Sequence, residues 1–435
     1  MANLVREAKY IKSDVAKNNN KFWYIAQYDD HSIEVKYGRV GNENAQTDNK
    51  NFSSEYAANS FFEKKCKEKE GTTKGYTKLK VIASTNVEVK TQSDNLLDIA
   101  LNQISNSSKE SADLIRYLIK ANVHNIVSST TMTYDAKKGT FSTPCGIVTQ
   151  EGIDEARVLL DELLPYVEKN DYIDKDFIKK LQTYIQLIPR KVGRKLDPKD
   201  IFPNVKSFEQ EIQILDSLDA SLQQVLTVPV TTDDDADKKP KDIPVVFKTS
   251  LELVTDQSII DYIIAFFNKT RQTMHTSSIL KVKRVFSVEI ADMVEGYTKD
   301  GLNVGGVMEL WHGTRVSNVL SILKSGLMIP KSNAPHVCGR LFGDGAYFSD
   351  QSTKSLNYAQ GYWDRNAKDN NCFMFLADVA MGKYFVPTGT SNNLPKPGFD
   401  STFAKGGQSG VMNNEMIVYR LGQCNLKYLV EFSDK

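Results

Sequence analysis

The spacing of apolar residues changes twice along the chain, and this pattern constrains the fold more than any other feature. Apolar residues alternate with polar ones near the N-terminus, recur every three to four residues in the middle, and form short runs beyond about residue 245. At roughly 100 to 200 residues per domain, 435 residues allow about two to four domains. The sequence therefore predicts an α+β multidomain protein with a small α+β domain over 1–90, an α-helical bundle over 91–230 and a mostly antiparallel β domain over 231–435.

The predicted N-terminal domain combines a hairpin with one helix. Two strands, 21–28 and 32–41, flank a polar turn, and Ser53 is placed to cap the helix that follows. The first 90 residues carry an excess of four positive charges and the remainder an excess of three negative charges, so the formal net charge of +1 conceals a basic head. Such a domain can neutralise a few phosphates of a nucleic acid, although a lysine-rich helix face is more often simply solvated.

The middle of the chain predicts a helical bundle. One apolar stripe runs from Ile153 to Val167, a second ends before Pro189, and Ser207 with Gln210 fits a capping box ahead of a third. The stretch 122–149 is rich in Thr, Ser and Gly and predicts a long loop or hairpin, and 227–244 has the composition of a linker. The last domain is expected to hold one helix over 258–270, a second near 316–325 and otherwise short strands.

Several classes of protein are excluded by what the sequence contains. No segment approaches the ~20 consecutive apolar residues of a membrane span, and the charged N-terminus does not resemble a signal peptide, so an intracellular protein without a membrane partner is expected. Five cysteines far apart and five scattered histidines predict neither a disulfide scaffold nor a metal site. Motifs typical of kinases, nucleotide triphosphatases, dehydrogenases and serine hydrolases are missing.

A set of polar and aromatic residues lies at the ends of predicted strands in the C-terminal domain. Its members are His312, Tyr347, Ser355, Tyr358 and Glu415. Each of them alone is more often structural, because strands routinely bury aromatic rings and expose carboxylates. Their combination in one domain is far more specific, and predicts a catalytic or binding site.

The order and spacing of the motifs that carry these residues resemble the catalytic domain of the poly(ADP-ribose) polymerase family. The motifs are LWHGT at 310–314, GRLFGDGAYFSD at 339–350, TKSLNYA at 353–359, NNEMIVY at 413–419 and NLKYLVEF at 425–432. Upstream, 184–193 and 207–222 resemble the helical regulatory domain of the DNA-dependent branch, and 22–41 with 53–65 is similar to its WGR domain. The resemblance therefore covers nearly the whole chain and matches the short form of the family.

The resemblance implies a DNA-break-stimulated transferase that uses NAD as its substrate and needs no metal. It would transfer ADP-ribose to side chains of proteins, including itself, release nicotinamide, elongate poly(ADP-ribose) and act in the DNA damage response. A nuclear location is implied in a eukaryote, and otherwise a cytoplasmic or nucleoid-associated one, but not secretion. The alternatives are a mono-ADP-ribosyltransferase and a non-catalytic DNA-end-binding module with a vestigial transferase fold.

The same resemblance assigns roles to individual residues. Glu415 would stabilise positive charge on the ribose and help to activate the attacking hydroxyl, while His312 would bind the adenosine ribose. The nicotinamide amide would be held by the backbone of Gly313 and the hydroxyl of Ser355, and its ring would lie between Tyr358 and Tyr347. In the N-terminal domain, Lys36, Tyr37 and Arg39 would contact DNA, with Tyr37 at the position of the family's name-giving Trp.

Four residues depart from the pattern of the nuclear polymerases. Arg340 and Leu341 stand where Tyr-Met is usual on the acceptor side, Asp344 replaces a usual Lys, and Met328 stands where an Arg often contacts the donor. The His312, Tyr347 and Glu415 trio favours chain elongation, whereas these departures leave polymer length and acceptor preference open.

Overall fold

The computed structural model describes most of the chain and divides it into two compact units. The described residues are 2–14, 19–39, 45–71, 74–78, 96–135, 140–143, 146–190, 197–205, 207–222, 245–329, 341–360, 371–391 and 393–434. The first unit comprises Met1–Asn95 and His124–Pro244, and the second comprises Leu96–Val123 and Val245–Lys435. The predicted linker at 227–244 lies outside the described residues.

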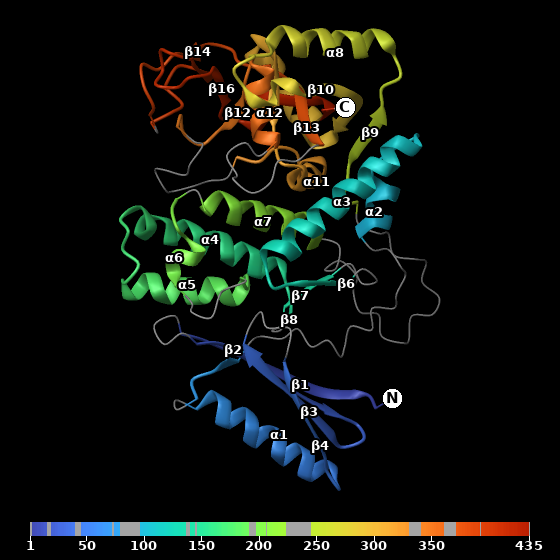
Figure 1. The fold of residues 1–435 in the computed structure, drawn as a ribbon, viewed down its shortest axis with the longest axis vertical. Coiled ribbons are helices and arrows are strands. Elements are labelled where there is room, and N and C mark those ends of the chain that lie inside the picture. Colours follow the sequence, from blue (N-terminus) through green and yellow to red (C-terminus); the bar gives the residue numbers. More distant parts are fainter. Residues whose placement is uncertain are drawn as a thin grey trace. The chain divides into compact units, whose positions relative to one another are not determined.

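The N-terminal part of the first unit is a five-stranded antiparallel sheet with one helix (Figure 1). Its strands, in the order β4-β3-β2-β1-β5, are β1 (Leu4–Asp14), β2 (Asn19–Tyr28), β3 (Ser32–Arg39), β4 (Gln46–Asn51) and β5 (Thr77–Lys78). Helix α1 (Glu55–Glu70) packs Ala58 and Phe62 against Tyr10, Trp23 and other residues of the sheet. The predicted hairpin and helix are confirmed, but Ser54 rather than Ser53 caps the helix by accepting from the N–H of Ala57.

The described residues of the same unit after His124 contain four complete helices and a small three-stranded sheet. The helices are α4 (Gln150–Glu168), α5 (Lys175–Leu187), α6 (Pro198–Ile201) and α7 (Ser207–Leu222), and the strands are β6 (Thr133–Asp135), β7 (Thr140–Thr143) and β8 (Gly146–Ile147). Both predicted apolar stripes are buried, as Leu163 and Leu181 show. The predicted capping box is wrong, because Ser207 is itself the first helical residue and its hydroxyl donates to the carbonyl of Asn204.

Two sheets form the core of the second unit, and they confirm the predicted mostly antiparallel fold. The larger, in the order β11-β13-β17-β10-β9, contains β9 (Thr249–Leu253), β10 (Lys281–Ile290), β11 (Val307–Gly313), β13 (Cys372–Ala380) and β17 (Cys424–Ser433). The smaller, β12-β16-β15-β14, contains β12 (Ala346–Phe348), β14 (Tyr384–Phe385), β15 (Ser401–Ala404) and β16 (Glu415–Val418), and only its β14–β15 pair is parallel.

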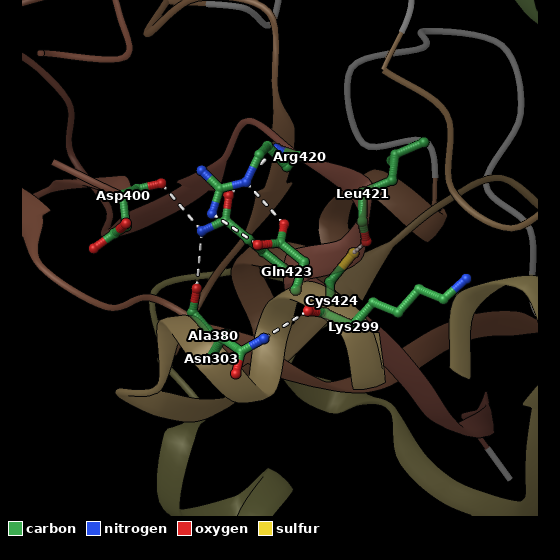
Figure 2. A network of polar contacts seen from close by, with 9 residues as sticks. Lys299, Asn303, Ala380, Asp400, Arg420, Leu421, Gln423 and Cys424 are labelled. Carbon is green, nitrogen blue, oxygen red and sulfur yellow. Dashed lines mark hydrogen bonds and ion pairs between the residues drawn. The ribbon is translucent and has the colours of Figure 1, made fainter. Parts of the chain in front are cut away.

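Short helices complete the second unit around these sheets. They are α8 (Gln257–Thr270), α9 (Ala291–Gly296), α10 (Leu302–Val304), α11 (Val316–Ser325) and α12 (Ser352–Gln360), with the single turns η1 (Thr276–Ile279), η2 (Tyr297–Gly301) and η3 (Leu421–Gln423). Figure 2 shows how the two sheets are joined at one end. The side-chain Nε2 of Gln423 donates to the carbonyl oxygens of Ala380, 3.0 Å away, and Asp400, 3.1 Å away. This amide fixes the end of β13 next to the segment that leads into β15.

Helix α2 (Leu96–Gln103) and the first part of α3 (Lys109–Ser129) belong to the second unit and run beside β9 (Figure 1). Ile99 and Leu118 enter the same core as Phe286, and the Gln103 side-chain oxygen accepts the backbone N–H groups of Val246 and Phe247. The compact units therefore do not coincide with the three predicted domains. Among the described residues, no helix combines the length and apolar character needed to cross a membrane.

The segment 122–149 is only partly the loop or hairpin that the sequence predicts. Helix α3 continues as far as Ser129, so the first third of the segment is helical. Strands β6 and β7 follow and pair antiparallel, with Tyr134 opposite Phe141. The buried side chain of Ile126 explains the extra helical turn, because it continues the apolar face of α3.

Candidate active site

Elements that are distant in the sequence meet at one end of the two sheets in the second unit. Backbone hydrogen bonds of 2.9 and 3.0 Å between Trp311 and Ser349 connect β11 to the end of β12. Helix α12 follows directly and packs against β11. The three elements surround a cavity of about 200 Å³. It is lined by His312, Gly313, Leu327, Met328, Gly345, Ala346, Tyr347, Phe348, Lys354, Ser355 and Tyr358.

The cavity thus brings together all five residues that the sequence analysis assigns to NAD binding. His312 and Gly313 end β11, Tyr347 lies in β12, and Ser355 and Tyr358 come from α12. Ser355 and Tyr358 are three positions apart and therefore share one side of the helix. Their gathering supports a binding site, while the role of each residue remains a prediction.

His312 is held in one tautomer by the strand next to it. Its Nδ1 lies 2.9 Å from the carbonyl oxygen of Tyr347, which can only accept a hydrogen bond, so Nδ1 carries the proton. Burial lowers the pKa of His312 and favours the neutral ring. The other ring nitrogen, Nε2, is therefore left as an acceptor, and it suits a hydroxyl of a ligand.

Gly313 and Ser355 are packed backbone to backbone. A Cβ atom placed on Gly313 would lie 1.8 Å from the carbonyl oxygen of Ser355, a distance that no side chain tolerates. The Ser355 hydroxyl in turn donates to the carbonyl of Trp311 at 3.1 Å. Glycine at position 313 is therefore needed for α12 to approach β11.

Replacing Gly313 with Ala should destabilise the protein by about 1 to 3 kcal/mol, because α12 has to move away from β11 to make room. The same displacement should weaken binding of a nicotinamide analogue. Thermal unfolding and calorimetric titration would measure both effects. Gly389→Ala is the matched control, since a Cβ there meets no atom within 4 Å. Equal behaviour of the two variants would contradict the packing argument.

Two tyrosine rings border the cavity in different ways. The Tyr347 hydroxyl donates to the carbonyl of Gly343 at 2.8 Å and accepts the N–H of Phe342 at 3.0 Å, which fixes its ring. Tyr358 keeps 42% of its surface exposed, so its ring can contact a ligand. A fixed ring and an accessible ring are suited to holding a flat heterocycle.

Glu415 lies beside the cavity rather than in its wall. It is the first residue of β16, it is buried, and its Oε1 lies 3.0 Å from Nζ of Lys354, which does line the cavity. Burial lowers the pKa of Lys354, and the Glu415 carboxylate partly opposes this shift. The pair places a carboxylate and an ammonium group at one end of the cavity.

The sequence analysis missed Lys354 and assigned no role to His275. Lys354 stands one turn before Tyr358 on α12, and that helical spacing was the available signal. His275 is buried, its Nδ1 lies 2.8 Å from Oγ1 of Thr353, and its side chain is hydrogen bonded to Asn413. Thr353 precedes Lys354, and Asn413 lies two residues before Glu415. One imidazole therefore connects the two segments that carry the Lys354–Glu415 pair.

Two of the residues that depart from the family pattern, Met328 and Leu341, have exposed side chains. Met328 lines the cavity and is 43% exposed, and Leu341 is 45% exposed. Arg340 lies outside the described residues. In the part of the chain that the structure describes, no three His, Cys, Asp or Glu side chains gather in an arrangement that could hold a metal ion.

The three residues predicted to bind DNA lie on β3 but not on one face of the sheet. Side chains alternate along a strand, so Tyr37 and Arg39 share the face that α1 covers farther along, and Lys36 points to the other. Tyr37 is 40% exposed, whereas the Lys36 ammonium lies 2.9 Å from a carboxylate oxygen of Glu34. Tyr37 and Arg39 are thus the members of the predicted set that can act together.

Comparison with known proteins identifies a known domain at each end of the chain. Residues 260–434 match the family model described as the poly(ADP-ribose) polymerase catalytic domain, and residues 8–81 match the WGR domain. A poly(ADP-ribose) polymerase-like protein of invertebrate iridescent virus 6 is 31% identical over 186 residues, which cover 40% of this chain and 93% of the viral protein. The chain belongs to the poly(ADP-ribose) polymerase family.

Longer members of the poly(ADP-ribose) polymerase family match a larger part of the chain at lower identity. Human poly [ADP-ribose] polymerase 2 is 24% identical over 387 residues, covering 84% of this chain and 63% of that protein. Zebrafish poly [ADP-ribose] polymerase 1 is 28% identical over 320 residues, covering 66% of this chain. The match spans only 30% of the zebrafish protein's length.

Proposed function

We propose that this protein is an NAD-dependent ADP-ribosyltransferase that transfers ADP-ribose to side chains of proteins, including its own, and releases nicotinamide. The observation that carries the proposal is the buried Lys354–Glu415 pair beside a cavity lined by His312, Ser355 and Tyr358. This arrangement supplies a positioned carboxylate next to a site with an aromatic ring and hydrogen-bonding groups. Those are the features that cleavage of a nicotinamide–ribose bond requires.

The proposed reaction depends on charge stabilisation and on positioning. Breaking the bond between nicotinamide and ribose develops oxocarbenium-like charge on the sugar, which the Glu415 carboxylate is placed to stabilise. The backbone of Gly313 and the hydroxyl of Ser355 would hold the leaving amide, with its ring against Tyr358. Nε2 of His312 would accept a ribose hydroxyl of the adenosine part. Lys354 would hold the Glu415 carboxylate in place.

Elongation of a polymer requires a second role for Glu415. The attacking group is then a ribose hydroxyl of the chain end, and a carboxylate within hydrogen-bond reach can act as its base. Within the part of the chain that the structure describes, the ion pair with Lys354 uses Oε1 of Glu415, so Oε2 is the oxygen that would accept that hydroxyl. Leu341 departs from the family pattern at a position that the resemblance assigns to the acceptor side, and this departure makes a shorter polymer or mono-transfer the second candidate.

Incubation with labelled NAD, with and without broken duplex DNA, tests these alternatives on a denaturing gel. A high-mass smear supports a polymerase and a discrete labelled band supports a mono-transferase. A wild-type protein that takes up no label under either condition would contradict the proposal and favour a DNA-end-binding module. A stronger signal with broken DNA supports stimulation by breaks, and on that basis we propose a role in the DNA damage response, with a nuclear location in a eukaryote.

We further propose that the WGR domain binds the DNA end. Replacing Tyr37 with Ala should weaken binding of a nicked duplex by about 1 to 3 kcal/mol, because its exposed ring can stack on a terminal base or sugar. The logarithm of the wild-type affinity should fall as the logarithm of the salt concentration rises. The slope should correspond to only a few phosphate contacts, because the first 90 residues carry an excess of only four positive charges. Fluorescence anisotropy measures both. Tyr56→Ala, at an 83% exposed tyrosine of α1, is the control, and an equal loss there would contradict the stacking role.

A further inference from the structure

The outer edge of the smaller sheet in the second unit carries lysines and aromatic rings together. The strand order β12-β16-β15-β14 makes β14 the edge, and β15 separates it from β16. Ala404 of β15 is the register partner of Glu415, and Ser401 at the other end of β15 is the partner of Tyr384 in β14. Strand β15 therefore connects the edge strand β14 to the position of Glu415, the candidate catalytic carboxylate.

Three lysines and three phenylalanines define this edge patch. They are Lys383, Lys396, Lys405, Phe385, Phe399 and Phe403. Each ammonium nitrogen lies over one ring: Lys383 is 4.7 Å from the centroid of Phe399, Lys396 is 5.8 Å from that of Phe385, and Lys405 is 5.5 Å from that of Phe403. Such spacing lets the rings stabilise the cations while leaving their N–H groups toward solvent.

The rings form two pairs that lie on opposite faces of the edge strand, because Tyr384 and Phe385 are consecutive residues of β14. Phe385 and Phe399 meet edge to face at 5.4 Å, and Phe403 meets Tyr384 edge to face at 5.5 Å. Tyr384 keeps 41% of its surface exposed at the edge of the sheet. The exposed Tyr384 ring, which is held by its contact with Phe403, can stack with a heterocyclic base.

The positive charge of the patch is not neutralised by its neighbours. None of the three lysines forms an ion pair within the residues that the structure describes. Asp400 is the only carboxylate in the sequence between residues 381 and 414, and one of its oxygens accepts the backbone N–H of Lys383 at 2.9 Å. Figure 2 shows that the backbone carbonyl of Asp400 accepts a hydrogen bond from the side chain of Gln423. The patch therefore presents uncompensated cations beside stacking surfaces.

We propose that the edge patch binds poly(ADP-ribose), the product of the proposed reaction, as it leaves the active site. Each unit of that polymer has a pyrophosphate, which the lysines complement in charge, and an adenine, which an exposed ring can stack on. Continuity with Glu415 through β15 favours this polymer over a nucleic acid, for which nothing places an end near this sheet. The inference rests on the proposed function for the origin of the polymer.

The experiment measures binding of externally supplied polymer by the full-length chain without NAD. The probe is fluorescently labelled poly(ADP-ribose) of defined length, with excess unlabelled duplex DNA to occupy the N-terminal domain. The combined variant Lys383→Gln, Lys396→Gln and Lys405→Gln should bind about 10- to 100-fold more weakly. The slope of log affinity against log salt should become shallower by about 2, at roughly 0.7 per phosphate contact for a flexible chain.

Two further proteins make the result decisive. Lys269→Gln, Lys281→Gln and Lys299→Gln removes the same charge from exposed lysines on other elements of the unit, and should leave affinity within about twofold. The triple Lys→Arg variant of the patch should restore binding, because charge and ring contact are kept. Equal loss in both Gln variants, or no loss in either, would overturn the inference. An equal loss for single-stranded DNA of the same charge would also overturn it, in favour of a general polyanion surface.

Failure of the proposed transferase function can be distinguished from failure of polymer binding by the patch. Because the polymer is supplied from outside, its binding does not depend on whether this chain makes it. Consumption of NAD, measured separately, should be unchanged in the patch variant during the first turnovers and should slow only as chains lengthen. A chain that binds polymer through the patch but consumes no NAD would contradict the transferase proposal and leave the patch as a polymer-reading surface.

Discussion

Replacing Glu415 with Gln should abolish chain elongation and lower NAD turnover by about 10²- to 10³-fold, the usual cost of removing one group that stabilises transition-state charge. Gln has nearly the same shape but carries no charge, so it loses both the stabilisation of the ribose cation and the capacity to accept a proton. Because Glu415 lies beside the cavity and not in its wall, binding of a nicotinamide analogue should change little. Labelled NAD on a gel reports elongation, and nicotinamide release reports turnover.

Glu289→Gln provides the matched control for this loss of charge. Glu289 is an exposed carboxylate on β10 and lies outside the cavity, so its neutralisation should leave both readouts unchanged. A residual discrete band from the Glu415 variant, without a smear, would show that attachment of the first unit depends less on the base than elongation does. Full-length polymer from this variant would refute the role proposed for Glu415.

The residues of the candidate site could be found in the sequence because their motifs lie at the ends of strands. His312 is the last residue but one of β11, Glu415 begins β16 and Tyr347 lies in β12. The ends of β11 and β12 lie side by side because Trp311 and Ser349 are hydrogen bonded. Short apolar runs bounded by turn residues predicted those strands well. What the runs did not reveal was which strands pair, and therefore that the backbone of Trp311 bonds to that of Ser349 and connects β11 to the end of β12.

Partners of buried groups were much harder to predict than the groups themselves. A lysine on a short polar helix is usually solvated, so nothing in the sequence indicated that Lys354 is buried against Glu415. His275 was one histidine among five, and its contacts to Thr353 and Asn413 come from two segments 60 or more residues away. Such pairings depend on tertiary packing, which local periodicity does not encode.

The same limit applies to the division of the chain. The apolar faces of α2 and α3 predict that these helices are buried, but not against which neighbour. The core that Ile99 and Leu118 share with Phe286 assigns them to the C-terminal unit. Strand β1 was also missed, because Arg6, Glu7 and Lys9 interrupt the alternation that a strand should show. Arg6 in fact lies over the Phe62 ring, 4.3 Å from its centroid, so its charged side chain is part of the packing.

Replacing Lys354 with Met should destabilise the protein by about 3 to 5 kcal/mol, because it leaves the buried carboxylate of Glu415 without its cation. Activity should fall with it, since the carboxylate loses the contact that fixes its position. Lys283→Met is the control: its partner Glu431 is also buried, but Arg284 pairs with the same carboxylate, so little should be lost. Denaturant unfolding measures stability. The double variant Lys354→Met with Glu415→Gln should recover part of it, and a double variant as unstable as the single one would contradict the pairing.

The dependence of NAD turnover on alkaline pH distinguishes the catalytic role of the Lys354–Glu415 pair from its role in stability. Burial lowers the pKa of Lys354, so its ammonium should lose its proton below the ordinary lysine value near about 10.4. In that window the unfolded state binds more protons than the folded state, so the contribution of Lys354 to stability rises with pH. Activity should nevertheless fall there, because the neutral amine no longer holds the Glu415 carboxylate by charge. Thermal unfolding and NAD turnover measured across this range should therefore diverge, and the alkaline loss of activity should disappear in Lys354→Met. Activity and stability that decline together would instead assign the loss to general unfolding.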